Sequence, residues 1–225
     1  MKSKIWESKH LRVYDKILLH SEIYLAVRDF HISAMESSKT VLDSGAGTGN
    51  VTIELLNMGQ EVYAVDTSQQ AIKILEQKCA GFPHLLHAMH INDDETLPFK
   101  KGMFDGVTSM FVISYIRDIE SYIREIFRVL KVGGIFALTG RITSQDLDTV
   151  LHSYENDLRK KGVLEEYESS FSTFKKNFET DVTKSSVHNH TFHQVRKILL
   201  DIGFKDIEEV KNPYFGQCFS LVAYK

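Results

Sequence analysis

The sequence of 225 residues contains only two cysteines, Cys79 and Cys218, and they lie far apart in the chain. Their spacing matches neither a zinc site nor a disulfide framework, so we expect no metal centre and a reducing compartment. We interpret both cysteines as small apolar side chains of the core.

The chain also lacks a strong excess of charge and a long apolar run. Its formal net charge is −3 and its pI is near 6.4, which disfavours nucleic acid as a general partner while leaving a local basic patch open. The N-terminal MKSKIWESKH has no apolar signal region, and no stretch approaches the roughly 18 apolar residues of a membrane span. We therefore expect a soluble, cytoplasmic protein without a membrane span; its oligomeric state stays open.

What the sequence does contain is a core of ordinary size for one domain, with 43% hydrophobic residues. Apolar strand-like runs alternate with amphipathic helical stretches, which is typical of a parallel sheet with helices on both faces. The strand-like runs are 40–43, 61–65, 83–89, 104–110 and 135–139, and the helical stretches between them are 51–58, 70–79 and 121–130.

Four segments of a single domain follow from this organisation. Helical spacing of apolar residues between 11 and 35 predicts an N-terminal helical cap over 1–39, ahead of a cofactor-binding core over 40–143. A stretch rich in Glu, Lys and aromatic residues predicts a helical insertion or lid over 144–190. A helix at 192–201 and two alternating runs, 205–210 and 217–224, predict a C-terminal helix and β-hairpin over 191–225.

The stretch VLDSGAGTGN at 41–50 combines a short strand with a glycine-rich turn. Glycines stand at 45, 47 and 49, so the dinucleotide pattern G-x-G-x-x-G fails at Asn50. Asp43 at the mouth of the turn would repel a pyrophosphate, whereas it would attract an ammonium or sulfonium group. The turn therefore predicts a cationic ligand without phosphate.

A second acid, Asp66, ends the run EVYAVD about 20 residues after the first glycine, where such folds place a carboxylate that accepts hydrogen bonds from a ribose diol. By itself, Asp66 is equally consistent with an exposed cap of the helix that starts near Ser68. Together with the glycine turn, it favours a bound nucleoside.

With these motifs in order, the chain resembles the class I S-adenosylmethionine-dependent methyltransferases, specifically the small-molecule branch that includes ubiquinone and menaquinone biosynthesis-type enzymes. The resemblance implies a Rossmann-like α/β fold: a seven-stranded, mostly parallel sheet with one antiparallel strand, N-terminal helices and a helical insertion after the fifth strand. It implies S-adenosyl-L-methionine as cofactor and S-adenosyl-L-homocysteine as product. It covers about 40–139 through VLDSGAGTGN, EVYAVDTS, DDETLPF, FDGVTSMFVISYI and EIFRVLKVGGIFALT, and continues weakly in TFHQVRKILLDIGFKDIEEV.

The resemblance also implies a set of cofactor-binding residues. The backbone of Gly45, Ala46 and Gly47 would lie against the methionine moiety, with Asp43 near its ammonium group. Asp66 would accept from the ribose hydroxyls, and Thr67 would lie beside the adenine.

Further contacts implied by the resemblance come from three other segments. Asp93 would accept from the adenine amino group and Asp94 would offer its backbone N–H to the ring, with Asn92 or a one-residue shift left open as the alternative. Met110 and Phe111 would wall the pocket, together with Ser109. Tyr14 would cover the cofactor.

Methyl transfer from a sulfonium depends mainly on holding the acceptor in line with the methyl group, so a general base is optional. His152, His188, His190 and Tyr115 are candidates for one, and none is assigned. The atom methylated (O, N or C) and the small-molecule acceptor stay unresolved. The helical insertion either caps the acceptor or simply packs on the sheet.

Other functions remain open on the sequence. They are a tRNA or protein methyltransferase of the same fold, a non-catalytic S-adenosylmethionine-binding module, and a nicotinamide-dependent oxidoreductase that uses the turn for pyrophosphate. The segment NPYF at 212–215 resembles a nucleic-acid amino-methyltransferase motif, but its place after 205–210 favours a turn between the last two strands.

Overall fold

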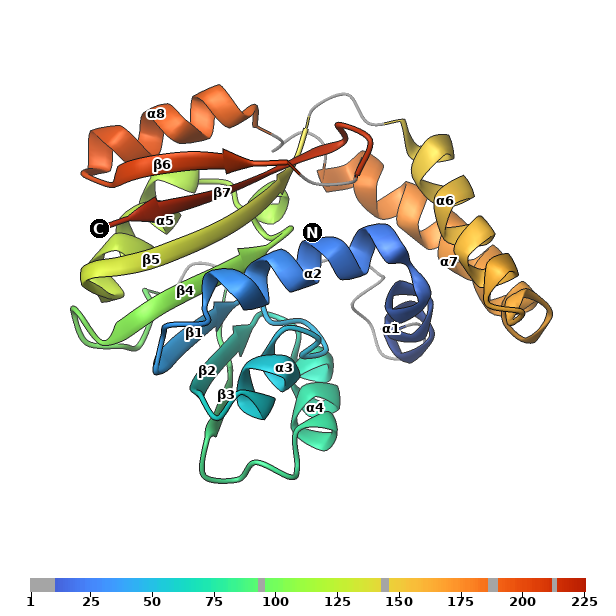
Figure 1. Cartoon of the computed structure of the whole chain (residues 1–225), viewed down its shortest axis with the longest axis horizontal. Helices are drawn as coiled ribbons and strands as arrows, with labels where there is room; N and C mark the ends of the chain where they lie inside the picture. Colours follow the sequence, from blue (N-terminus) through green and yellow to red (C-terminus); the bar gives the residue numbers. More distant parts are fainter. Residues whose placement is uncertain (1–10, 93–95, 143–145, 186–189, 212–213) are drawn as a thin grey trace.

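The computed structural model describes residues 11–92, 96–142, 146–185, 190–211 and 214–225. These residues form a seven-stranded sheet in the order β3-β2-β1-β4-β5-β7-β6 (Figure 1). The pairs among β1 to β5 are parallel, while β7 runs antiparallel to both β5 and β6. The predicted fold class is confirmed. The strands are β1 Thr40–Ser44, β2 Glu61–Asp66, β3 Leu86–His90, β4 Phe104–Met110, β5 Leu130–Arg141, β6 Lys205–Val210 and β7 Cys218–Tyr224.

Helices cover both faces of the sheet because its central strands are apolar on both sides. On one face, α2 (Glu22–Ala34), α3 (Thr52–Asn57) and α4 (Gln69–Lys78) enclose a core that includes Leu55 and Leu75. On the other face, α5 (Ile119–Val129) and α8 (Phe192–Ile202) pack over a second apolar layer (Figure 1). Because β1 to β5 pair in parallel, their carboxyl ends all lie at the same edge of the sheet, between the two helical layers.

Residues that favour a helix terminus mark the ends of two of the helices. Thr191 caps α8 in a reciprocal capping box with Gln194, and Gly203 ends the helix in the left-handed region at φ 117°. Ser68 caps α4, because its Oγ accepts from the Ala71 N–H at 3.1 Å. These caps set where the strand-to-helix turns begin and end.

A separate apolar cluster lies beyond the carboxyl ends of the parallel strands. We call it the second core. It joins α1 (Leu11–His20) and α2 to the insertion after β5, which forms two helices, α6 (Leu147–Lys160) and α7 (Leu164–Ser185) (Figure 1). Its buried aromatic members are Tyr24, Tyr154, Phe171, Phe174, Phe178 and Tyr214.

The opposite end of the sheet holds residue 225. The Lys225 N–H donates to the Gly134 carbonyl at 3.0 Å, and the Gly133 N–H donates to the Lys225 carbonyl at 2.8 Å. The Lys225 side-chain amine donates to the carbonyl of Leu130 at 2.7 Å and to that of Phe127. Residue 225 is thus fastened to the start of β5.

In the part of the chain that the structure describes, no helix combines the length and apolar character needed to cross a membrane.

Candidate functional site

The glycine turn begins where β1 ends. The N–H groups of Gly45 and Ala46 donate to the Val65 carbonyl at 2.8 and 3.0 Å, which fastens the turn to β2. Gly45 has a φ of 77°, and a Cβ there would lie 2.2 Å from the Val112 side chain. A side chain at position 45 would therefore clash with the segment after β4 and strain the backbone.

The third glycine of the turn serves packing against a helix. Gly49 has a φ of 84°, and a Cβ there would lie 2.7 Å from Leu75 of α4. The turn and α4 can approach this closely only with glycine at position 49. The middle glycine of the turn, Gly47, lies next to the end of β2, where its N–H donates to Asp66.

Asp66 lies at that end of β2 and is held by backbone donors. Its Oδ2 accepts from the Gly47 N–H and its Oδ1 from the Ser68 N–H, both at 2.8 Å. Burial raises the pKa of Asp66, and these donors oppose the increase. With the backbone hydrogen bond from Thr67 also counted, the carboxylate still keeps acceptor capacity that a diol could use. The helix α4 is capped by Ser68, not by the Asp66 side chain.

Asp43, the acid before the first glycine, is buried at 3% exposure. Its Oδ2 accepts a hydrogen bond of 2.6 Å from the Thr52 hydroxyl. Burial raises its pKa to about 7, and the nearby charge of Asp66 adds to this increase. A cation that entered the site would favour the ionised form of Asp43.

The carboxyl ends of β1 and β4 are held together by a tyrosine that the sequence pattern did not reveal. The Tyr122 hydroxyl of α5 lies 3.0 Å from Ser44 Oγ and 2.8 Å from Ser109 Oγ. Within the helix, Tyr122 follows the same apolar pattern as the core residues around it. Its polar contacts become visible only in the folded sheet, where β1 and β4 lie side by side and bring Ser44 and Ser109 together.

Phe111 follows β4 directly and has an unusual backbone conformation. Its φ is 63°, and its N–H donates to the Thr139 carbonyl of β5 at 2.9 Å. A bulky residue at positive φ is uncommon, and such residues cluster at functional sites. This conformation places Phe111 among the aromatic side chains of the second core.

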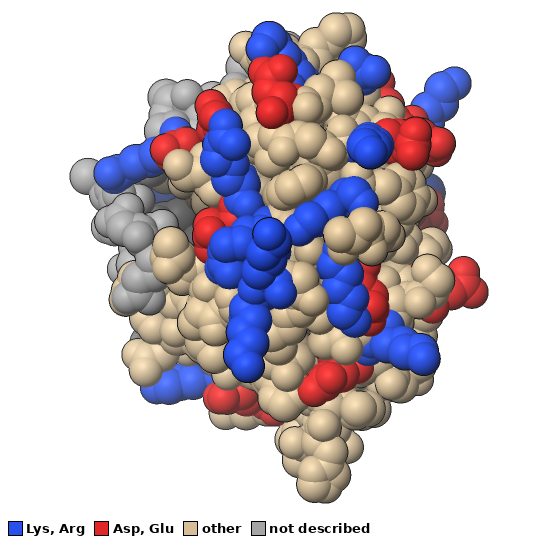
Figure 2. Space-filling model, turned by 90° about the vertical axis from the view of Figure 1, so that its left-hand side faces the viewer, with Lys and Arg blue, Asp and Glu red and all other residues tan. Residues whose placement is uncertain are grey.

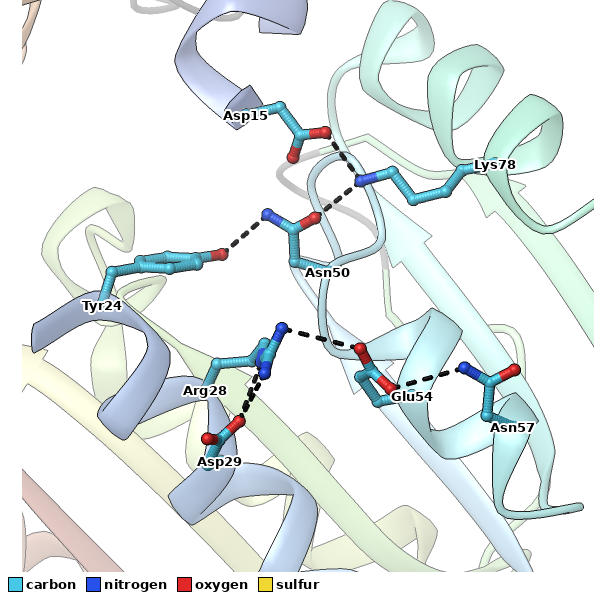
Figure 3. Close-up of polar contacts among 8 residues, drawn as sticks. All are labelled: Asp15, Tyr24, Arg28, Asp29, Asn50, Glu54, Asn57 and Lys78. Atoms are coloured by element: carbon cyan, nitrogen blue, oxygen red, sulfur yellow. Dashed lines mark hydrogen bonds and ion pairs between the residues drawn. The ribbon is translucent and has the colours of Figure 1, made fainter. Parts of the chain in front are cut away.

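Helix α1 is linked to the glycine turn by a polar network (Figure 3). Asp15 accepts from the Thr48 hydroxyl at 2.5 Å and from the Lys78 amine at 2.8 Å. The Lys78 amine also donates to Asn50 Oδ1 at 2.6 Å, and the Asn50 amide donates to the Tyr24 hydroxyl at 3.0 Å. The network joins α1, α2 and α4 to one side of the turn.

A small cavity of about 30 Å³ lies between the end of β5 and the second core. Tyr14 of α1 lines it and packs on Phe174 at a ring separation of 5.1 Å. Phe111 lines it as well, 5.4 Å from the Tyr214 ring. The remaining lining residues are Leu18, Tyr24, Arg141, Leu147, Val150, Tyr154, Phe178 and Tyr214. Tyr14 thus faces aromatic residues of α7 and the cavity.

Arg141 is the charged member of this lining, and sequence reasoning did not identify it. It is the last residue of β5 and is 6% exposed. One guanidinium nitrogen donates to the Tyr115 hydroxyl at 3.2 Å. In the sequence, a basic residue at the end of a strand indicates a solvent-exposed strand end. The burial of Arg141 follows only from the packing of the insertion over β5.

The other predicted residues fall in three groups. Thr67 follows β2, and its carbonyl accepts from the His90 ring at 3.2 Å. His152 is exposed on α6, whereas His190 precedes α8, and Tyr115 ends the short 3-10 helix η2 (Ile113–Tyr115). Asp93, Asp94 and His188 lie outside the described residues.

A larger hollow, about 1040 Å³, lies elsewhere, at the amino ends of β1 and β4 near Lys39, Asp105 and Lys131. In open α/β sheets, ligands bind at the carboxyl ends of the strands. The glycine turn, Asp43 and Asp66 are at those ends, so we place the candidate site there despite its smaller cavity.

Comparison with known proteins gives a consistent result. A family model described as "Methyltransferase domain" matches residues 42–138. Demethylmenaquinone methyltransferase of Corynebacterium efficiens is 35% identical over 100 residues, which are 44% of this chain and 40% of that protein. An uncharacterized methyltransferase of Bacillus subtilis is 28% identical over 140 residues, 59% of this chain and 54% of that protein. The matched region thus spans about half the length of these curated relatives.

Solved structures show the same fold at low identity. A structure titled as a putative S-adenosyl-L-methionine-dependent methyltransferase of Methanococcus maripaludis has a TM-score of 0.63 at 18% identity, covering 96% of this chain and 90% of that chain. The 1,6-didemethyltoxoflavin-N1-methyltransferase of Burkholderia thailandensis, with bound substrate and S-adenosylhomocysteine, has a TM-score of 0.59 at 16% identity, covering 89% and 78%.

Proposed function

Because the chain carries a class I S-adenosylmethionine-dependent methyltransferase domain, we propose that it transfers a methyl group to a small-molecule acceptor. The reaction takes place at the carboxyl ends of β1, β4 and β5. The observation that carries the proposal is a pair of acids, the buried Asp43 and the half-buried Asp66, on either side of a glycine turn.

The chemistry of the donors and acceptors on this turn fits S-adenosylmethionine. A buried carboxyl with a pKa raised to about 7 suits an ammonium group, and a carboxylate with spare lone pairs suits a ribose diol. In this proposal Asp43 binds the ammonium group and Asp66 the ribose. The other residues that would hold the cofactor are Gly45, Ala46 and Gly47 through their backbone, and Thr67, Asp93, Asp94, Met110, Phe111 and Tyr14.

When bound, S-adenosylmethionine supplies a methyl group that is already activated as a sulfonium substituent. The protein's own contribution is orientation and exclusion of water. Phe111, held by the Thr139 carbonyl, and Met110 form the wall between the glycine turn and the second core. Of the candidate bases, Tyr115 lies against Arg141 and so is near the cavity. Its hydroxyl is the group we would test first as a proton acceptor.

The surface supports a small acceptor over a nucleic acid. Figure 2 shows Lys and Arg side chains gathered on the side of the molecule where the parallel strands begin, with Asp and Glu among them. The cavity at the other end of the sheet is lined mainly by aromatic and aliphatic side chains. A relative named for demethylmenaquinone also points to a small cyclic acceptor. Methylation of tRNA or protein stays the alternative, and a cytoplasmic location stays a prediction.

The test of the proposed function is ligand-dependent thermal stability. S-adenosylhomocysteine at about 100 times its dissociation constant should stabilise the fold by about 2.7 kcal/mol, which for a domain of this size raises Tm by about 5 to 10 °C. Asp66→Ala should abolish the shift, whereas Asp201→Asn on the exposed side of α8 should leave it unchanged. A shift with NAD and none with S-adenosylhomocysteine would overturn the proposal. A full shift without methyl transfer to any acceptor would favour the non-catalytic module.

A further inference from the structure

The side of the molecule where the parallel strands begin carries a group of lysines, and Figure 2 shows Lys and Arg side chains gathered there. We call this group the lysine face. Its members are Lys39 before β1, Lys100 and Lys101 before β4, Lys131 at the start of β5, and Lys225 after β7. The sheet brings them together because β1, β4, β5 and β7 are consecutive neighbours. Since β7 runs antiparallel to β5, its end meets the beginnings of the other three strands.

Most of the charge on the lysine face has no acid opposite it. Lys39, Lys100 and Lys101 are exposed, and none of them forms an ion pair with a residue that the structure describes. The Lys225 amine donates to two backbone carbonyls, which are uncharged. Burial and the nearby charge of Lys101 lower the pKa of Lys225. The face therefore has a positive potential that a negatively charged partner would neutralise.

An exposed apolar side chain lies among these lysines. Val132 is 92% exposed, and the turn that carries it is fixed on both sides. Before it, the Lys131 amine pairs with Asp105 at 2.6 Å. After it, the Gly133 N–H donates to the Lys225 carbonyl at 2.8 Å. The turn thus holds Val132 in the solvent, where burial against an apolar partner would be favourable.

The hollow of about 1040 Å³ at the amino ends of the strands lies beside Val132. Its lining includes Lys39 and Lys131, together with the Tyr224 ring, which is 39% exposed. Glu36 is the exposed acid of this lining. The lysine face thus combines positive charge with exposed apolar surface. These are the two features by which a protein binds an anionic lipid surface without crossing the membrane.

The chemistry of the cations favours lipid over nucleic acid. Arginine is the residue of choice for nucleic-acid recognition, because its fork binds phosphate in two-point geometry. Arg128, which is next to the face through the Gly102 N–H, already donates to Glu125 and to the carbonyls of Leu97 and Phe99. A lysine ammonium is a hydrated point charge, which suits the diffuse field of anionic headgroups. An aliphatic side chain can enter a lipid layer, but it cannot stack on a base.

We propose that the lysine face, with Val132 among its lysines, binds the surface of a membrane that contains anionic lipids. The lysines lie over the headgroups, and Val132 enters the boundary between the headgroups and the acyl chains. This inference goes beyond the proposed function and does not depend on it. Because the glycine turn is at the opposite ends of the strands, the bound protein keeps its cofactor site turned to the solution.

The test is co-sedimentation of the full chain with lipid vesicles, either of phosphatidylcholine alone or with added phosphatidylglycerol. The protein should bind the anionic vesicles at low ionic strength, leave them as salt is added, and not bind the neutral ones. Lys100→Gln combined with Lys101→Gln should lower the partition coefficient roughly twentyfold, about fivefold for each lysine. Val132→Ser should lower it about fivefold by removing the apolar contact.

Lys16→Gln combined with Lys176→Gln is the matched control. Both lysines are exposed on helices of the second core, α1 and α7, and this variant loses the same charge. It should bind anionic vesicles as the unchanged protein does. An equal loss in the control would overturn the assignment to the lysine face. Absence of binding to anionic vesicles at low salt, or equal binding to neutral ones, would also overturn it. Binding of an RNA oligonucleotide but not of vesicles would identify nucleic acid as the partner instead.

Amide exchange of the protein bound to anionic vesicles locates the contact. Protection should increase at 100–103 and 131–134, whereas the glycine turn at 45–49 should exchange as in the free protein. Added protection over the glycine turn and α7, with none at 131–134, would place the membrane at the other end of the sheet and overturn the proposal.

Discussion

Asp43 has different protonation preferences in the free and the occupied site. Burial raises its pKa to about 7 in the free protein, and a bound ammonium group would lower it. The affinity for S-adenosylhomocysteine should therefore rise as the pH increases through about 7, with release of a proton on binding. Calorimetry between about pH 6 and about pH 8, in two buffers with different ionisation enthalpies, measures both effects.

Asp43→Asn should remove the pH dependence and weaken binding about tenfold, since a close ion pair is worth roughly 1 to 4 kcal/mol before desolvation. The matched control is Asp29→Asn on α2, whose side chain is 58% exposed and pairs with Arg28. Unchanged affinity in Asp43→Asn would contradict the role of its charge.

His31 predicts a pH-dependent stability. Its ring nitrogens lie 2.6 Å from Thr108 Oγ1 and 2.8 Å from Thr139 Oγ1, and burial lowers its pKa to about 3. The unfolded chain takes up a proton near pH 6.5, so the stability that neutral His31 supplies is complete above that pH. This stability is lost as the pH falls from about 6.5 toward 3.

Between pH 6.5 and 5 the contribution lost should be about 2 kcal/mol. Urea unfolding at the two pH values measures it in the unchanged protein. His31→Gln should be less stable at neutral pH but should show a smaller loss on acidification. His193→Gln, on the exposed side of α8, should keep the full loss, and an identical loss in His31→Gln would refute the assignment.

At the scale of elements, α1 depends on the glycine turn for part of its position. Asp15→Ala removes the acceptor shared by Thr48 and Lys78. Because it leaves the buried Thr48 hydroxyl and the half-buried Lys78 amine with one partner fewer, we expect a loss of about 1 to 3 kcal/mol. Amide exchange in α1 should accelerate, and S-adenosylhomocysteine should dissociate faster.

Lys16→Gln is the control for this change, since Lys16 is exposed on the same helix. Exchange in α1 should be unaffected in that variant. If Asp15→Ala leaves α1 exchange at its original rate, then apolar packing alone, not the polar network, holds the helix.

The bounds of individual strands and helices show how far local sequence patterns can predict the fold. Strands and helices of the core were predicted within a few residues, because their apolar periods and glycine turns are encoded locally. The run at 83–89 becomes a strand only at Leu86, since Leu85 and Leu86 first form a turn to the Phe82 carbonyl. β5 starts at Leu130, earlier than predicted, and its first residues pair with Lys225. Because Lys225 is far from β5 in the sequence, its pairing with the start of this strand leaves no pattern in the residues around Leu130.

At the scale of the molecule, the two halves of the site differ in how far they could be predicted. The cofactor side is built from one turn and the ends of two strands, so short motifs in the sequence suffice to indicate Asp43 and Asp66. The lining of the small cavity draws Arg141, Phe178 and Tyr214 from separate elements. No spacing in the chain indicates such a wall, and Arg141 was therefore missed.

The second core should also unfold with some independence from the sheet. Phe174 is 3% exposed and contacts the rings of Tyr14, Tyr154, Phe171 and Phe178. Phe174→Ala should cost about 3 to 5 kcal/mol locally. Regional amide exchange should show lost protection in α6 and α7, with little change in β1 and β4.

Phe215→Ala serves as the control, because Phe215 is 52% exposed and little packing is lost with it. A uniform loss of protection over the whole chain in Phe174→Ala would show that the second core and the sheet unfold as one unit. If Phe174→Ala still binds the cofactor, the glycine turn keeps its shape when the second core is disturbed.

The fastening of Lys225 to the start of β5 has a practical consequence for handling the protein. A linker attached at residue 225 leaves the molecule where the parallel strands begin (Figure 1), so immobilisation there turns the glycine turn and the insertion toward the solution. The Lys225 amine is engaged by two backbone carbonyls and makes a poor coupling handle. A tether on α1 would instead pull on the network at Asp15. Surface-based binding measurements should therefore attach the protein through a linker at residue 225 and not through the Lys225 amine.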